Sequence, residues 1–275
     1  MILPRLHALA VAAPVMLVLA PAPAAAQAAD APTRPYCPTR PSLGAGACIT
    51  EIGHPMLEMG VADWQRETDD GGRTDTFLTG DTLVRVGLGD TTEVQLGWTA
   101  VGHVRERDAT GMVDRRTRIG DVSLALRQNL SNPDGSGFSL ALQPFVTLPV
   151  GRQPIGEGTW GAGLTVPMGY ELNDIVQLQL TAEVDATPDE DGIGRHRAYS
   201  AIGGIALTLS KAVSATVELS AARDRDPDGA QTFLLAALSG GYQVSDNAQI
   251  DCGTAIGLNA DSPAVRIFAG FSRRF

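Results

Sequence analysis

The chain has 275 residues and a formal net charge of −10, so it lacks the basic surface of nucleic-acid-binding proteins and we expect no nucleic-acid partner. Its hydrophobic fraction is 44% and its mean hydropathy is +0.02. That is too polar for a bundle of membrane-spanning helices, but it suits strands in which apolar and polar residues alternate. The length allows one large domain and a short leader.

Residues 1–28 have the features of a cleaved signal peptide for secretion. A weakly basic start precedes an apolar run at 8–20, and small residues suited to cleavage follow it. The alternative is a membrane anchor, but the run contains Pro14 and is shorter than the roughly 20 residues that a spanning helix needs. No later stretch is long and apolar enough to span as a helix, so a membrane-bound mature chain would have to be a β-barrel.

Residues 29–55 are rich in proline and show no regular period, which predicts irregular coil. Cys37 and Cys48 lie here, and export would place them in an oxidising compartment. A disulfide between them is favoured over a metal site, because no pair of histidines lies nearby. Two roles stay open for this segment: a plug or cap at one barrel end, and a periplasmic tail without a role in transport.

From Met56 to the C-terminus, apolar and polar residues alternate, which predicts strands. In the clearest strand, Trp160, Leu164 and Tyr170 share one face with other apolar residues, and the opposite face is polar. We expect twelve strands, an even number as in bacterial single-chain barrels. Their approximate ranges are 56–67, 76–88, 92–107, 115–129, 137–150, 159–172, 175–187, 196–210, 212–225, 231–244, 247–258 and 264–275.

Short and long connections alternate between these strands. Barrels of the outer membrane show this asymmetry, with short periplasmic turns and long external loops, so both mature termini are predicted to be periplasmic. Short turns are predicted at 89–91, 131–136, 173–174, 211 and 245–247, and long loops at 68–75, 108–114, 151–158, 188–195 and 226–230.

The polar faces of the strands carry more charged residues than a packed protein core tolerates. With lipid outside and a polar lumen inside, the same pattern costs little, so residues 56–275 are predicted to form an all-β, transmembrane, antiparallel up-and-down β-barrel. Acidic residues outnumber basic ones, which leaves open a cross-paired, hydrated lumen and a cation-tolerant path. The candidate lumen-lining residues are Arg85, Glu93, Asp121, Arg127, Glu171, Glu183, Asp185, Glu218, Asp251 and Arg266.

Aromatic residues near the predicted strand ends suit the two membrane–water interfaces. The last strand ends on Phe275, and we expect outer-membrane lipid and the barrel-assembly machinery, the latter through this strand, as partners. The aromatic residues predicted at periplasmic ends are Phe138, Tyr170, Tyr242 and Phe275, and those at external ends are Phe77, Trp160 and Tyr199.

Four strand–turn segments carry a resemblance to a known family: Thr82–Gly97 (TLVRVGLGDTTEVQLG), Ile119–Leu130 (IGDVSLALRQNL), Phe145–Gly151 (FVTLPVG) and Gly257–Phe275 (GLNADSPAVRIFAGFSRRF). They resemble the outer-membrane proteins grouped under the meta-pathway of phenol degradation. The resemblance covers about residues 75–275. It implies a barrel in a bacterial outer membrane that moves small, often aromatic or hydrophobic, compounds.

The sequence contains no pattern that indicates a metal, a cofactor or a catalytic nucleophile. The histidines of the mature chain, His54, His103 and His196, are scattered. We therefore predict a channel or transporter for small molecules, with no enzyme activity, no cofactor and no metal. The alternatives are a structural barrel without flux and a barrel lipid hydrolase, which would need a serine beside a histidine such as His103, predicted to face the lumen near the external end.

Overall fold

The protein is described by a computed structural model that covers residues 32–69, 71–189 and 192–275. The signal peptide predicted for residues 1–28 lies outside the described residues. No helix in the described part of the chain is long and apolar enough to cross a membrane.

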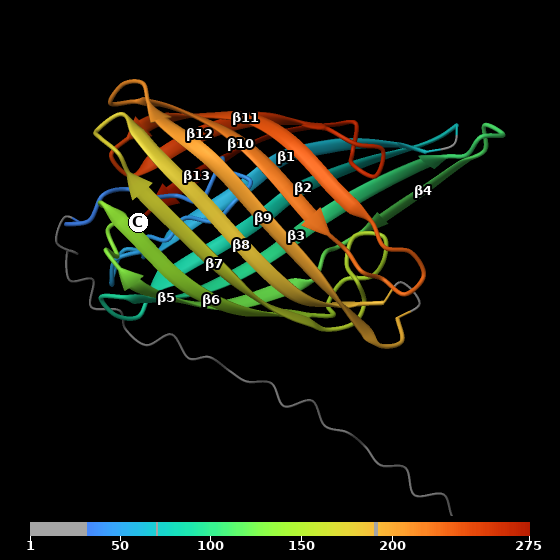
Figure 1. The fold of residues 1–275 in the computed structure, drawn as a ribbon, viewed down its shortest axis with the longest axis horizontal. Helices are drawn as coiled ribbons and strands as arrows, with labels where there is room; N and C mark the ends of the chain where they lie inside the picture. Colours follow the sequence, from blue (N-terminus) through green and yellow to red (C-terminus); the bar gives the residue numbers. More distant parts are fainter. Residues whose placement is uncertain (1–31, 70, 190–191) are drawn as a thin grey trace, which may run out of the picture. The chain divides into compact units, whose positions relative to one another are not determined.

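The described residues form thirteen antiparallel strands that close into one barrel (Figure 1). The strands are β1 (Met56–Asp69), β2 (Gly72–Gly87), β3 (Thr92–Arg107), β4 (Val113–Arg118), β5 (Val122–Ser131), β6 (Phe138–Leu148), β7 (Gly161–Glu171), β8 (Val176–Pro188), β9 (Arg195–Thr208), β10 (Val213–Arg223), β11 (Thr232–Ser245), β12 (Ala248–Gly257) and β13 (Val265–Arg274).

The barrel is twelve strands around, because β4 and β5 follow one another along the same neighbour, β3. The sheet closes where β1 pairs with both β2 and β13. This confirms the predicted fold class, and β4 and β5 together correspond to the single strand predicted at 115–129. The C-terminus and the connections that follow β2, β5, β7, β9 and β11 lie at one end, here called the turn end (Figure 1). The opposite end, which carries the β1–β2 hairpin and the longer connections, is called the loop end.

The long loop predicted at 68–75 is wrong, because β1 and β2 continue through this stretch. Thr68 pairs with Arg73 and Asp69 with Gly72, so the pairing of the two strands extends to the end of the hairpin. Gly71 has a φ of +85°, in the left-handed region that such hairpin turns require. The charged residues that suggested a loop are paired across the strands instead, as in the salt bridge from Arg66 Nε to Asp75 Oδ1 at 2.8 Å.

The outer face of the barrel is apolar and the inner face is polar. In β3, Leu96 and Trp98 are 45% and 39% exposed, whereas the alternating residues Glu93 and Gln95 are buried. All seven aromatic residues predicted for the two interfaces are exposed as well. The side chains that are fully buried are largely polar, and the four largest are Arg85, Arg127, Glu58 and Glu93.

The residues of β3 that face the lumen change along the strand. Glu93 and Gln95 are buried near its start and Val104 near its end, so the buried face passes from odd-numbered to even-numbered residues. On the neighbouring strand β2, Gly80 has a φ of +69° and is skipped in an otherwise continuous register with β3. His103 therefore lies on the outer face, in register with Phe77, which is 41% exposed. The prediction that His103 faces the lumen is wrong for this reason.

Candidate functional site

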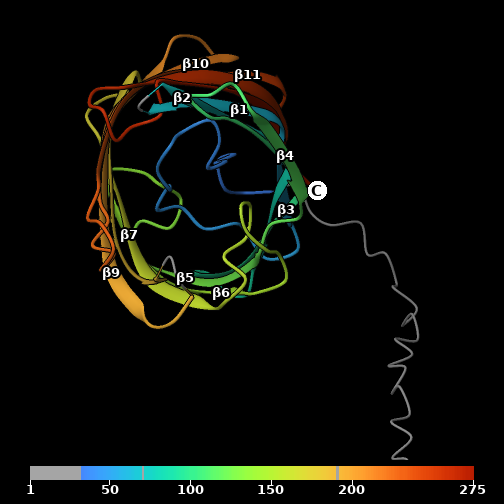
Figure 2. The ribbon, with the colours of Figure 1, turned by 90° about the vertical axis from the view of Figure 1, so that its right-hand side faces the viewer.

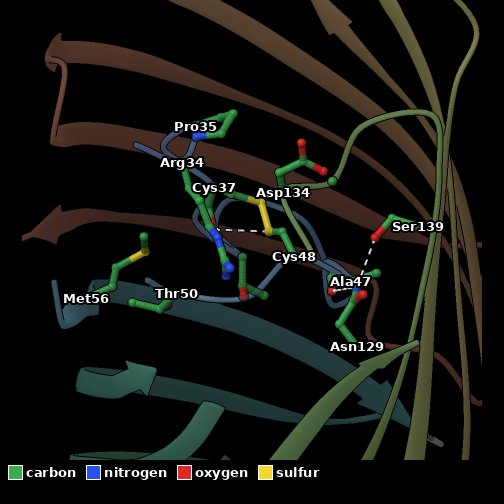
Figure 3. The surroundings of a disulfide bond; sticks show 12 residues. Arg34, Pro35, Cys37, Ala47, Cys48, Thr50, Met56, Asn129, Asp134 and Ser139 are labelled. Atoms are coloured by element: carbon green, nitrogen blue, oxygen red, sulfur yellow. Dashed lines mark hydrogen bonds between the residues drawn. A yellow bond between two sulfur atoms is a disulfide. The ribbon is translucent and has the colours of Figure 1, made fainter. Parts of the chain in front are cut away.

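Residues 32–55 form irregular chain inside the barrel at the turn end, and we call them the plug. Figure 2 shows the plug within the ring of strands. Cys37 and Cys48 are joined by a disulfide in its middle, beside Asn129 and Ser139 of the barrel (Figure 3). Burial raises the pKa of Tyr36, also in the plug, to about 12, so this phenol stays neutral.

Arg85 of β2 ties the plug to the barrel. Its Nη1 donates to the carbonyl oxygen of Cys37 at 2.9 Å and its Nη2 to that of Cys48 at 3.0 Å. The same guanidinium pairs with Glu58 at 3.1 Å and with Glu93 at 3.0 Å. An arginine has five N–H donors, and all of them can be used in this way. The charge and the donors of Arg85 are therefore satisfied by these partners although the side chain is fully buried.

Lumen carboxylates accept hydrogen bonds from backbone N–H groups of the plug. Glu58 accepts from Thr39 and Arg40 at 2.8–3.0 Å, and Glu93 accepts from Thr50 at 2.6 Å. Coil buried without such partners would leave backbone groups unsatisfied, which costs free energy. The inward carboxylates thus replace the water that an irregular segment would otherwise need.

The plug also contacts strands farther around the barrel. Asp251 of β12, two strands from β1, forms a salt bridge with Arg40 at 2.8 Å. Glu218 of β10, five strands from β2, accepts hydrogen bonds from Ser42 Oγ and from the backbone N–H of Leu43, the latter at 2.9 Å. The contact with β10 holds the plug across the lumen.

The plug leaves part of the lumen empty. A cavity of about 430 Å³ opens at the turn end between the plug and the strands β7–β12, with Gln177, Gln179 and Gln249 among its lining residues. A second cavity of about 60 Å³ reaches the disulfide and shares Gln177 and Gln179 as lining residues. Both cavities lie between the plug and β8.

Of the candidate lumen residues, Arg85, Glu93, Glu218 and Asp251 contact the plug as described. Arg127 of β5 joins them, with Nη1 at 3.2 Å from the Cys48 carbonyl oxygen and at 3.2 Å from Glu93 Oε1. Arg85, Glu93 and Arg127 come from the neighbouring strands β2, β3 and β5 and pair with one another. The plug connects this group to Glu218 and Asp251 on more distant strands.

The other candidates lie away from the plug. Glu183 accepts from Thr165 Oγ1 at 2.6 Å, and its neighbour on the same face, Asp185, is half-buried. Arg266 pairs with Asp63 of β1, with Nε at 3.0 Å from Oδ1. Both pairs lie beyond the plug toward the loop end.

Asp121 and Glu171 hold connections between strands. Asp121 lies between β4 and β5 and accepts from the backbone N–H groups of Gly151 and Glu157, each at 2.7 Å. It therefore fixes the β6–β7 loop. Glu171 is exposed at the turn end, where it accepts from the backbone N–H of Gly137 at 3.0 Å.

Sequence reasoning missed several residues of the site. Glu58 alternates with outward-facing residues in the first strand and shares its inward face with Met56 and Gly60. This alternation is visible in the sequence and could have identified Glu58 as a lumen residue. Arg40 and Ser42 stand in coil with no period, so no pattern assigned them a partner. The hydrolase alternative needs a serine beside His103, whereas His103 Nδ1 lies 2.8 Å from Thr117 Oγ1.

A valine at Gly87 is expected to disturb the plug. A Cβ at this position would lie 2.2 Å from the carbonyl oxygen of Thr50, so Gly87→Val must displace the backbone of the plug, at a cost of about 1–3 kcal/mol. We expect a lower denaturant midpoint for the folded barrel. The matched control is Gly89→Ala, where a Cβ meets no atom within 4 Å. Equal midpoints for the two variants would contradict this contact.

Searches with the structure found outer-membrane barrels. The chain is similar to the COG4313 outer membrane channel from Pseudomonas putida F1, with 14% identity, a TM-score of 0.67 and coverage of 83% of this chain and 98% of that one. The translocator domain of the autotransporter NalP from Neisseria meningitidis has 11% identity and a TM-score of 0.53, with 82% and 90% covered. The NanC porin has 8% identity and a TM-score of 0.50, with 80% and 100% covered. At these identities the similarity shows the fold.

The search of curated proteins found no match. The family model described as "Putative MetA-pathway of phenol degradation" matches residues 44–275, which includes the second half of the plug and the whole barrel. Because this match covers most of the chain, the protein belongs to that family.

Proposed function

We propose that the protein is an outer-membrane channel for small molecules whose lumen is narrowed by its own N-terminal segment. The observation that carries the proposal is the polar lumen, in which a hydrogen-bonded plug leaves two cavities that share lining residues of the plug and of β8. An apolar outer face between two sets of exposed aromatic residues supports a position in a membrane.

The cargo proposed is a small, aromatic or hydrophobic compound. The family description names phenol degradation, and the cavity of about 430 Å³ falls within the roughly 300–1,000 Å³ of small-molecule sites. Amides such as those of Gln177 and Gln179 could bind a phenolic hydroxyl, and the proline-rich plug offers apolar contacts on the facing side.

The turn end is proposed to face the periplasm. Short periplasmic turns are the rule in such barrels, and this orientation puts the plug and both mature termini on the periplasmic side. The last strand, ending at Phe275, would then be available to the barrel-assembly machinery.

In outer-membrane fractions, the folded protein should resist SDS without heating and change its migration on a gel after boiling. A protein found free in the periplasm would contradict the membrane location.

Neutralising two lumen carboxylates is expected to lower the preference for cations. Glu183 and Asp185 lie on one face of β8 with half-buried carboxyl groups, and fixed negative charge in a narrow pore favours cations. Glu183→Gln with Asp185→Asn should shift the reversal potential, measured in a salt gradient across a planar bilayer, toward that of a non-selective pore. Asp246→Asn, in an exposed turn, is the control. An unchanged reversal potential in the double variant would place the conducting path elsewhere.

Planar-bilayer recording of the full mature chain tests channel function itself. Discrete current steps are expected, small ones because the plug occupies much of the lumen. A chain that inserts as a folded barrel but gives no current steps, with or without its plug, would favour the structural barrel without flux.

A further inference from the structure

A cluster of one histidine and three aspartates lies at the loop end, away from the plug. His196 is near the start of β9, Asp189 directly follows β8, and Asp224 and Asp226 follow β10. Because β8, β9 and β10 are adjacent in the sheet, their ends bring these side chains together. The sequence gives no metal-binding spacing here, since the residues come from three strands.

Two carboxylates converge on one nitrogen of His196. The Nδ1 atom lies 2.9 Å from Asp189 Oδ1 and 3.4 Å from Asp226 Oδ2. The three side chains are 6%, 14% and 12% exposed, and one ligand atom from each lies within 4.8 Å of the others. Two carboxylates that share a partially buried position repel each other unless a positive charge lies between them.

Asp224 lies at the other ring nitrogen. The Nε2 atom of His196 is 2.6 Å from Asp224 Oδ1, and Nδ1 is hydrogen-bonded to Asp189 Oδ1 at 2.9 Å. The imidazole is therefore more than nine-tenths buried, with a carboxylate at each nitrogen.

We propose that Asp189, His196 and Asp226 bind a divalent first-row transition-metal ion. Ligand atoms at about 2.0–2.2 Å from such an ion lie roughly 3.0–3.5 Å from one another, which is the spacing found around Nδ1. One imidazole with two carboxylates suits Zn²⁺ and its neighbours better than Mg²⁺ or Ca²⁺, which prefer oxygen ligands alone. Asp224 on the far side of the ring would orient it.

The surrounding charges favour a cation. Burial raises the pKa of the Glu157 carboxyl, and the carboxylates of Asp121 and Asp224 raise it further. The β6–β7 loop therefore brings an additional acidic group toward the cluster. A bound ion would reduce this repulsion and link the β8–β9 and β10–β11 connections at the loop end, where cargo would enter or leave.

Calorimetric titration of the purified full mature chain with Zn²⁺, in chelator-free detergent micelles, tests the site. One ion per chain is expected. Asp189→Asn and His196→Gln should each weaken binding by at least about tenfold. Two matched controls should bind as the wild type does: Asp228→Asn, an exposed aspartate of the β10–β11 connection, and His103→Gln, a histidine outside the cluster. Heat-modifiability on a gel confirms that each variant is folded.

Several outcomes would overturn the proposal. These are the absence of saturable Zn²⁺ binding, equal loss of binding in the controls, and tighter binding of Ca²⁺ than of Zn²⁺. If no ion binds and His196 titrates as an imidazolium among the three aspartates, the cluster is an ion-pair network instead. Because the titration measures binding alone, its result is independent of whether the barrel conducts.

Discussion

Deletion of residues 32–52 is expected to raise the ion conductance of the barrel severalfold. The plug crosses the lumen at the turn end. It is fixed by Arg85, Glu58 and Asp251 on β2, β1 and β12, and by Glu218 on β10, far around the barrel. Without it, water would occupy the space and hydrate these charges. Barrels with an open lumen conduct through water, whereas filled ones do not. Planar-bilayer recording of the deleted and full chains in the same lipid gives the comparison.

The disulfide provides a milder version of the same experiment. Cys37→Ser with Cys48→Ser removes a cross-link that typically contributes about 2–4 kcal/mol, while every residue of the plug remains. Noisier currents of intermediate size are expected, because the plug would leave its position part of the time. Equal conductance in the full, deleted and serine-substituted chains would show that the plug does not limit flux.

Arg85→Leu is expected to cost about 3–5 kcal/mol of folded-state stability, the usual penalty for breaking a buried ion pair from one side. The arginine is 1% exposed. Its removal would leave Glu58 without its salt-bridge partner and the Cys37 carbonyl without its donor, while Glu93 and the Cys48 carbonyl would keep Arg127 alone of their two arginines. A lower urea midpoint in lipid or detergent measures the loss. Larger currents are expected alongside, since the plug would be held less firmly.

Arg266→Leu is the matched control for Arg85→Leu. This arginine also pairs with an acidic residue across adjacent strands, Asp63, but it is 34% exposed, and partly exposed pairs contribute about 0–1 kcal/mol. The polar contacts of its side chain within the described residues are with Asp63, and none is with the plug. A loss for Arg266→Leu as large as that for Arg85→Leu would mean that burial in the lumen does not set the strength of these pairs.

The barrel was predictable from sequence because lipid and lumen impose opposite demands on alternate residues. Strands such as 160–172 show this alternation directly. The alternation fails where the backbone departs from it. The change of the buried face along β3 put His103 on the outside, and the glycine turn at Gly71 converted a predicted loop into a hairpin.

The plug was predictable as coil but not in its position. Its residues have no period, and its contacts are mostly backbone groups, which every sequence has. The carboxylates that receive them, such as Glu93 and Glu218, are visible in the sequence only as inward charges. Two interpretations were open for such charges: they could pair with one another across the lumen, or they could line an open path. The sequence cannot separate these, because the groups that the carboxylates bind belong to the plug, which has no regular pattern.

The cluster around His196 escaped sequence reasoning for a different reason. Metal-binding patterns are recognised when ligands are close in sequence, whereas Asp189 and Asp226 precede and follow His196 on other strands. Only the adjacency of β8, β9 and β10 brings them together. A site built from the ends of different strands can therefore be recognised only when the order and the register of the strands are known.

Small solutes are expected to cross this barrel beside the plug. This can be measured as the swelling rate of proteoliposomes that contain the full mature chain, in a series of uncharged aromatic and sugar solutes of increasing size. Phenol-sized solutes should give faster swelling than in empty liposomes, and the rate should fall sharply as solute size increases. Deletion of residues 32–52 should raise the size limit. No swelling with either chain, although both are inserted and folded, would contradict this expectation.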